Sequence, residues 1–337
     1  MEKLNAMLLI KDARQKLQGK NVRTMAMIHT GVIVAASVLI TLLQYVLEEG
    51  VAGTGGLSGM GTRSLLQTAQ TVLQWANVVL APFWNLGFLY VAMQWARGNA
   101  PQKEDLLMGF HRVGPCLGLL LNRSVLTFCV VFLCVNLCTT FYMMLPASAK
   151  ITDIAAAAGN DVNVFYASLE GMSQAQQQEV LNSMMPLLIA VGLLSLVLLV
   201  PLLYRFRLAE YAILNQKGLR AMPAMIVSTA LMHSRCWQFF KIDLRLWWYH
   251  GLKVLCSLIL YGDLLLSALG VALPVSGETA YFVTYFAYLA ALFAVEVSFR
   301  PYVETVYAGA YETLMAMGPV QKKQAPVAPQ KMPWDEP

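Results

Sequence analysis

The sequence predicts an all-α, polytopic membrane protein with six transmembrane helices. Only 13% of its 337 residues are charged, about half the ~25% that is typical of soluble domains. The apolar residues make up 58% of the chain and collect in runs that are long enough to cross a bilayer. Lys and Arg lie almost entirely in alternate segments between these runs. This composition excludes a disordered protein, a disulfide-rich secreted scaffold and a coiled coil.

Six apolar runs satisfy the length of a membrane span. A helix rises 1.5 Å per residue, so about 20 residues cross a hydrocarbon core of ~30 Å. Five runs carry no charge over 24, 33, 26, 25 and 17 residues, and a sixth is interrupted only by Asp263. The predicted helices are 24–47, 64–96, 116–146, 180–204, 253–273 and 279–299, of which the last two meet the criterion least well.

The positive charges orient these helices. With the N-terminus in the cytoplasm, the cytoplasmic segments 1–23, 97–115 and 205–252, the adjoining helix ends and the C-terminal part hold 22 of the 24 Lys and Arg residues. The outer loops 48–63, 147–179 and 274–278 hold only Arg63 and Lys150. Basic residues resist translocation, so both termini are predicted to be cytoplasmic and the number of spans to be even. The net charge of +5 is too small and too scattered to predict nucleic-acid binding.

The N-terminal segment 1–23 is predicted to be a cytoplasmic amphipathic helix. The first apolar run is too long for the core of a signal peptide, and no small-residue cleavage pattern follows it, so we expect it to remain as a signal anchor. The six cysteines lie in or beside apolar segments and none is in an outer loop. We expect buried apolar side chains here, with no disulfide and no metal site.

The predicted helices form three hairpins, each followed by a cytoplasmic amphipathic segment. The first hairpin turns at a Gly-rich outer loop, and in the second outer loop Ser173 and Gln176 predict a capping box at the start of a helix. After the third hairpin, Pro301 is expected to break or kink the chain before the amphipathic element 302–317. The Pro-rich tail 318–337 is expected to be disordered. The same count fits a plain helical bundle or the inverted repeat of many transporters.

The cytoplasmic stretch 222–244 predicts one interfacial helix. Pro223 suits a first helical position, and apolar residues recur from it at spacings of three and four, a helical stripe that contains Trp237 and Phe240. Arg235 and Lys241 are placed to reach lipid phosphates, and tryptophans are typical of the headgroup region. Two interpretations remain open, a helix that gates or binds a partner and a simple membrane-surface anchor.

Three blocks resemble a bacterial family of integral membrane proteins, domain of unknown function number nine hundred and seventy-five. They are residues 11–20 (Lys-Asp-Ala-Arg-Gln-Lys-Leu-Gln-Gly-Lys), residues 208–248, which contain Leu-Met-His and Trp-Gln-Phe-Phe-Lys-Ile-Asp-Leu, and residues 300–312, which begin Arg-Pro-Tyr-Val-Glu-Thr. The chain has Ser234 where the family usually has Gly, Arg245 where it usually has Ser, and a looser register in the last block. The resemblance implies a membrane fold, most common in Gram-positive bacteria, and no established activity or functional residue.

Asp263 is the most informative single residue. A charged group at the centre of a bilayer costs ~2.5–3.5 kcal/mol or more, so it needs a partner, water or a proton. One hypothesis makes Asp263 a proton or cation site in a transport path. The other makes it a neutral or paired acid that bonds to Asn85, Gln94 or Asn136 of neighbouring helices.

Glu296, Arg300 and Glu304 follow one another at intervals of four, on one helix face at the inner edge of the last span. Glu placed four residues before Arg is the favoured order for a helical ion pair. The pattern fits a structural ion pair that anchors the helix end, or a polar site used in transport.

No enzyme is predicted. The sequence contains no HExxH, Walker or GxGxxG motif. Gly-Leu-Ser-Gly at 56–59 has the letters of an intramembrane serine protease motif but lies in an outer loop, and the four His residues lie toward the cytoplasmic side. A Ser–His pair cannot form across ~30 Å of bilayer. We therefore expect a non-enzymatic scaffold or accessory component of the bacterial cytoplasmic membrane, with no cofactor, that contacts lipids and other membrane proteins and does not bind nucleic acid. The alternative is a small-molecule or ion transporter that uses Asp263.

Overall fold

The computed structural model describes residues 4–18, 21–53, 59–157, 159, 171–262 and 277–318. Within these residues the chain forms α-helices, two short 3₁₀ helices (η) and no β-strand, which confirms the all-α class for this part of the chain. The elements are α1 (Ala6–Leu17), α2 (Val22–Gly53), α3 (Gly59–Ala96), η1 (Lys103–Leu107), α4 (Met108–His111), α5 (Val113–Met143), η2 (Pro146–Ser148), α6 (Ala149–Ala157), α8 (Gln174–Phe206), α9 (Ala209–Asn215), α10 (Ala221–Met232), α11 (Cys236–Arg245), α12 (Trp247–Leu260) and α14 (Gly277–Met317).

Four helical stretches of the described chain are long and apolar enough to cross a membrane. They are Val22–Val46, Val113–Met143, Ala175–Asn215 and Tyr281–Met317, and each overlaps a predicted span. The other two predicted spans are not among these four. The span 64–96 lies within the single helix α3. The span 253–273 begins in α12, which ends at Leu260, and its residues 263–273 lie outside the described residues.

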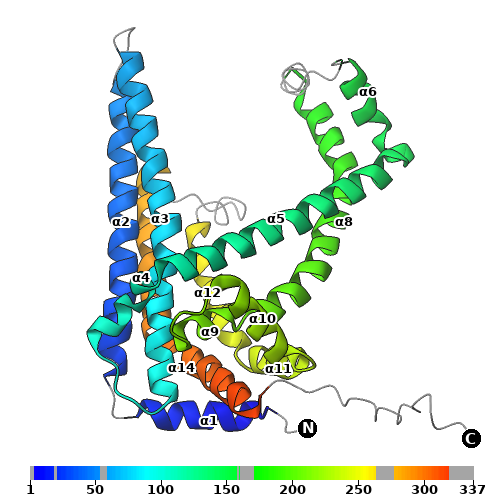
Figure 1. Cartoon of the computed structure of the whole chain (residues 1–337). Coiled ribbons are helices and arrows are strands. Elements are labelled where there is room, and N and C mark those ends of the chain that lie inside the picture. The colour runs from blue at the N-terminus through cyan, green and yellow to red at the C-terminus, as the bar shows by residue number, and fades with distance from the viewer. Residues whose placement is uncertain are drawn as a thin grey trace, which may run out of the picture. The chain divides into compact units, whose positions relative to one another are not determined.

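The chain divides into two compact units, which are described separately. The first contains residues up to Cys116 and from Leu208 onward. In it α2, α3 and α14 pack side by side, and α12 packs against α14. The short elements α1, η1, α4 and α9 pack around the same helices (Figure 1). The second unit, Leu117–Arg207, contains most of α5 together with η2, α6 and α8.

The core of the first unit lies toward one end of its long helices. Helices α3 and α14 have 38 and 41 residues, so they extend for about 57 and 62 Å, nearly twice the ~30 Å of a hydrocarbon core. The fully buried large side chains gather near their C-terminal ends, among them Phe88, Trp95 and Tyr311. Helix α1 covers α14 there, with Leu9 beside Gly309. Protein therefore surrounds this end of both helices.

Three local predictions can be compared with the structure. Ser173 precedes α8, and its backbone N–H donates to Gln176 Oε1 at 3.0 Å, so the capping box is confirmed. The segment predicted as the outer loop 48–63 contains the last turns of α2, which ends at Gly53, and the first turns of α3, which begins at Gly59. Pro301 does not break α14, which continues to Met317.

The predicted single helix 222–244 is wrong. Helix α10 ends at Met232 and α11 begins at Cys236. Between them Ser234 has φ 63°, in the left-handed region that glycine adopts without steric cost and other residues rarely do. The apolar stripe is therefore divided between two helices. The position that breaks the helix is the one where the resembled family usually has Gly.

Replacing Ser234 with Gly is expected to stabilise the protein. The left-handed conformation costs an L-residue roughly 1–2 kcal/mol, and the greater freedom of glycine in the unfolded chain offsets part of this gain. We expect the free energy of unfolding to rise by about 0.5–1 kcal/mol, measured from SDS or thermal unfolding in detergent. The matched control Ala230→Gly, inside α10, should lower it by about 0.5–1 kcal/mol. A destabilised Ser234→Gly variant would contradict the expectation.

Two hydrogen bonds link α5 and α8 in the second unit. The Arg123 guanidinium donates to the carbonyl oxygen of Phe206 at 2.6 Å, where α8 ends. The Tyr142 hydroxyl donates to the carbonyl oxygen of Ser183 at 2.7 Å. These bonds join α5 to α8 at two levels, one in the first half of α5 and one at its C-terminal end. The first also satisfies a carbonyl that a helix terminus leaves without an intrahelical partner.

Candidate functional site

Helix α14 places three charged side chains on one face at the spacing that the sequence predicts. Arg300 Nη1 lies 3.4 Å from Glu296 Oε2. Arg300 Nε lies 3.8 Å from Glu304 Oε1. The predicted ion pair is therefore confirmed, and it extends to both glutamates. Both contacts are ion pairs between a guanidinium nitrogen and a carboxylate oxygen.

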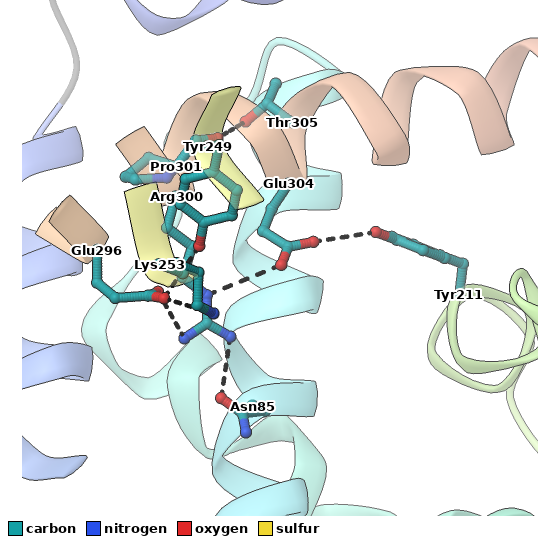
Figure 2. Close-up of polar contacts among 9 residues, drawn as sticks. All are labelled: Asn85, Tyr211, Tyr249, Lys253, Glu296, Arg300, Pro301, Glu304 and Thr305. Carbon is teal, nitrogen blue, oxygen red and sulfur yellow. Dashed lines mark hydrogen bonds and ion pairs between the residues drawn. The ribbon is translucent and has the colours of Figure 1, made fainter. Parts of the chain in front are cut away.

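Three other helices supply partners to these charges (Figure 2). From α12, the Tyr249 hydroxyl donates to Glu296 Oε1 at 3.0 Å, and Lys253 Nζ lies 2.8 Å from the same oxygen. From α3, Asn85 Oδ1 accepts a hydrogen bond from Arg300 Nη2 at 2.9 Å. From α9, the Tyr211 hydroxyl donates to Glu304 Oε2 at 3.4 Å. These contacts form the ion-pair cluster, which consists of Asn85, Tyr211, Tyr249, Lys253, Glu296, Arg300 and Glu304.

The ion-pair cluster is buried and formally neutral. The side chains of Glu296, Arg300 and Glu304 are 6%, 13% and 19% exposed, and only Lys253 reaches 43%. A buried ion without a partner costs several kcal/mol in lost hydration. Two carboxylates balance one guanidinium and one ammonium here, so each buried charge contacts an opposite charge. The arrangement joins α3, α9, α12 and α14 at one level of the first unit.

Each cation of the cluster lies close to an aromatic ring. Lys253 Nζ lies 5.5 Å from the centre of the Tyr249 ring, and the Arg300 guanidinium lies 4.9 Å from the centre of the Phe88 ring, both within the range of a cation–π interaction. Burial, and next the negative charge of Glu296, raise the pKa of the Tyr249 hydroxyl. This hydroxyl therefore keeps its proton and serves as a hydrogen-bond donor to Glu296.

His29 of α2 lies next to the cluster in an aromatic pocket. Its side chain is fully buried. The ring stacks on Trp84 at 5.6 Å and meets Phe88 at 4.6 Å between ring centres. Neither ring nitrogen has a hydrogen-bond partner among the described residues. Phe88 lies against both His29 and Arg300, so the same aromatic ring packs against α2 and against the cluster.

A second polar group continues toward the C-terminal end of α14. Arg97 of α3 forms an ion pair with Glu312 at 2.6 Å and donates a hydrogen bond to Asn215 of α9. Asn215 Nδ2 donates to the Tyr311 hydroxyl at 3.2 Å. Tyr311 stacks on Tyr211, with 5.6 Å between ring centres. Tyr211 contacts the cluster through its hydroxyl and this second group through its ring, so contacts between α3, α9 and α14 continue from one group to the other.

The structure brings together some of the predicted site residues and not others. Glu296, Arg300 and Asn85 meet in the ion-pair cluster. Asp263 lies outside the described residues. The partners that the sequence suggested for it are engaged locally: Asn85 accepts from Arg300, Gln94 Oε1 accepts from Asn99, and Asn136 Nδ2 donates to Phe132 O.

Sequence reasoning missed Tyr249, Lys253 and Tyr211. Tyr249 and Lys253 are four residues apart, so they share a face of the helix that opens the fifth predicted span. That spacing was a usable signal for the first two. Tyr211 carries no such signal, because only the packing of the first unit brings it to Glu304.

The residues predicted for an interfacial helix lie on α11 or next to it. Trp237, Phe240 and Lys241 are exposed, and Lys241 Nζ lies 6.0 Å from the centre of a Trp237 ring. Arg235 behaves differently, since its guanidinium donates to the carbonyl oxygen of Gly318 at 2.9 Å, just after α14 ends. A cation at this position satisfies a free carbonyl and interacts favourably with the helix dipole.

The described residues contain no group of three or more His, Cys, Asp or Glu side chains that could hold a metal ion. The six cysteines are free thiols. Cys116, Cys134 and Cys256 are buried within the protein, Cys138 and Cys236 are half-buried, and Cys129 is exposed on α5.

No family model, curated protein or solved structure matches this chain. The family resemblance therefore stays a prediction. The proposed function rests on the geometry of the two polar groups and of α11.

Proposed function

We propose that this chain is a six-span protein of the bacterial cytoplasmic membrane with both termini inside. The basic residues favour six spans over four. If only the four most apolar stretches crossed the membrane, segments 97–115 and 205–252 would lie outside together with their Lys and Arg residues, against the tendency of basic loops to remain in the cytoplasm. If α3 and the predicted span 253–273 also cross the membrane, both basic segments lie in the cytoplasm.

This topology predicts the sidedness of single cysteines in an otherwise cysteine-free chain. Lys103→Cys and Lys217→Cys, both at exposed positions, should react with a membrane-impermeant maleimide only after the cells are permeabilised. Glu179→Cys, exposed near the start of α8, should react in intact cells. Labelling of position 103 or 217 in intact cells would contradict six spans with the termini inside.

Within this topology, the function that we propose is a non-enzymatic scaffold or accessory component of the family that the sequence resembles. The observation that carries the proposal is the ion-pair cluster. Each of its four charges contacts an opposite charge, and the seven residues fasten four helices. A transport site has to release and rebind a charged group, whereas a neutral, buried cluster of this kind favours a rigid frame. The frame presents α1 and α11 toward the side that we assign to the cytoplasm.

A comparison of two variants tests the scaffold proposal against the transporter alternative. Crosslinking and pull-down from native membranes should recover partner proteins with the wild-type chain and with Asp263→Asn. The double variant Met7→Ala/Leu8→Ala, at two exposed apolar positions of α1, should insert normally and lose those partners. If Asp263→Asn instead abolishes a proton-linked or substrate-linked flux that the wild-type chain supports in proteoliposomes, the chain is a transporter and the scaffold proposal fails.

A further inference from the structure

Helix α11 has one side fixed against the protein. Phe239 and Ile242 are fully buried, and the Phe239 ring stacks on Tyr307 of α14 with 5.8 Å between ring centres. The Tyr307 hydroxyl donates to Asp243 Oδ1 at 2.7 Å, and the backbone N–H of Leu4 donates to Gln238 Oε1 at 3.0 Å. These contacts determine which side of α11 is turned away from the first unit.

The outward side carries an apolar stripe. Trp237 and Leu244 are 66% and 59% exposed, and Phe240 lies between them on the same face. The spacings of three and four residues put these side chains on one face of the helix. Trp247, at the start of α12, is exposed as well. A soluble surface rarely places large apolar side chains together in this way.

The charge on this side is entirely positive. Lys241 and Arg245 are exposed beside the apolar stripe. The only acidic residue of α11 is Asp243, which is bonded to Tyr307 on the inner side. We call Trp237, Phe240, Lys241, Leu244 and Arg245 the α11 outer face.

We infer that the α11 outer face binds anionic phospholipids of the cytoplasmic leaflet, an inference that rests on the topology proposed above. A helix with tryptophan and other apolar residues on one side and basic residues beside them lies in the plane of a membrane interface. Lys241 and Arg245 lie at the level of the lipid phosphates, and Trp237, Phe240 and Leu244 enter the acyl region. Helix α12 follows directly and begins the fifth span, which keeps α11 at the membrane boundary.

The test uses the purified full-length chain in nanodiscs made from equal parts of phosphatidylglycerol and phosphatidylcholine. Native mass spectrometry measures which lipid stays bound. A basic residue near an anionic surface contributes about 1 kcal/mol, which corresponds to about fivefold in affinity. We therefore expect Lys241→Gln and Arg245→Gln each to lower the preference for phosphatidylglycerol by about fivefold. The control Lys11→Gln/Lys217→Gln, at exposed positions outside α11, removes the same charge and should leave the preference unchanged.

Two results would overturn the inference. One is an unchanged lipid preference in the double variant Lys241→Gln/Arg245→Gln, or an equal loss in the control. The other is a photo-crosslinking amino acid at position 237 that captures protein rather than lipid in native membranes. The nanodisc exposes both leaflets to the same lipids, so the lipid result does not depend on orientation. A wrong topology would appear only in the maleimide labelling.

Discussion

Replacing Glu296 with Gln is expected to lower the free energy of unfolding by about 3 kcal/mol, because it removes the carboxylate that Lys253 and the largely buried Arg300 both contact. Glu296 Oε1 contacts Lys253 at 2.8 Å and Oε2 faces Arg300 at 3.4 Å. Without this carboxylate, Glu304 is the remaining acid beside Arg300, at 3.8 Å. Gln keeps the size of the side chain, so the change removes charge and leaves the packing of α12 on α14 in place.

The measurement is SDS or thermal unfolding in detergent, with a matched ion pair as the control. Asp12 and Lys16 of α1 lie 2.7 Å apart, and their side chains are 46% and 33% exposed. Exposed helical pairs contribute only about 0.3–0.5 kcal/mol, so Asp12→Asn should have little effect although its contact is the shorter one. If Glu296→Gln and Asp12→Asn lower the free energy of unfolding equally, burial does not determine how much the cluster contributes to stability.

A second substitution measures how strongly Glu296 and Lys253 are coupled. If Glu296→Gln is harmful because it leaves a cation unpaired, adding Lys253→Gln should restore part of the lost stability, so that the two losses are not additive. Residues in one ion-pair network commonly show coupling energies of about 0.5–3 kcal/mol. Additive losses would mean that Lys253, which is 43% exposed, is satisfied by solvent and that Arg300 alone depends on Glu296.

The parts of this cluster that could be predicted from the sequence are those within one helix. Glu296, Arg300 and Glu304 meet because residues four apart share a helix face, and the Ser173–Gln176 capping box follows from an equally local rule. Asn85, Tyr211 and Tyr249 reach the cluster from helices that are distant in sequence. The spacing of Tyr249 and Lys253 shows only that they share a helix face. Which partners that face meets depends on how α3, α9, α12 and α14 pack.

Periodicity also failed where the backbone changed direction. The stripe from Ile226 to Leu244 continues across Ser234 in the sequence, yet the left-handed φ at Ser234 separates α10 from α11. A pattern of apolar side chains does not report backbone dihedral angles.

The uncharged runs likewise predicted where helices occur better than where they end. Helix α3 covers the whole range 64–96, yet its last turns are enclosed by protein, with Trp95 fully buried. An uncharged run reports an apolar environment, which lipid and a protein core both provide. The length of the run therefore sets an upper limit on the membrane-embedded part of α3.

Replacing Gly87 with Ala is expected to detach the segment between α3 and α5 from α3. Helices η1 and α4 pack closely against α3. A Cβ atom at Gly87 would overlap the carbonyl oxygen of Leu106, and a Cβ atom at Gly109 would overlap the carbonyl oxygen of Phe83. Both obstacles are backbone atoms, which cannot move aside as a flexible side chain can. Overpacking typically costs about 1–3 kcal/mol and occasionally more, and we expect a loss of at least about 3 kcal/mol for this rigid contact.

Gly31→Ala in α2 is the matched control, because among the described residues no atom outside the neighbouring backbone of α2 lies within 4 Å of the added Cβ. Alanine is favoured over glycine in a helix by about 0.8–1.0 kcal/mol, so this control should be neutral or slightly stabilising. The same intrinsic gain applies to Gly87→Ala, and the clash has to exceed it. In addition to a lower unfolding midpoint, Gly87→Ala should make the segment 97–112 sensitive to limited proteolysis, since Leu106 is 1% exposed only while η1 is docked. If both variants unfold at the same midpoint and resist protease equally, the close approach of η1 to α3 does not stabilise the first unit.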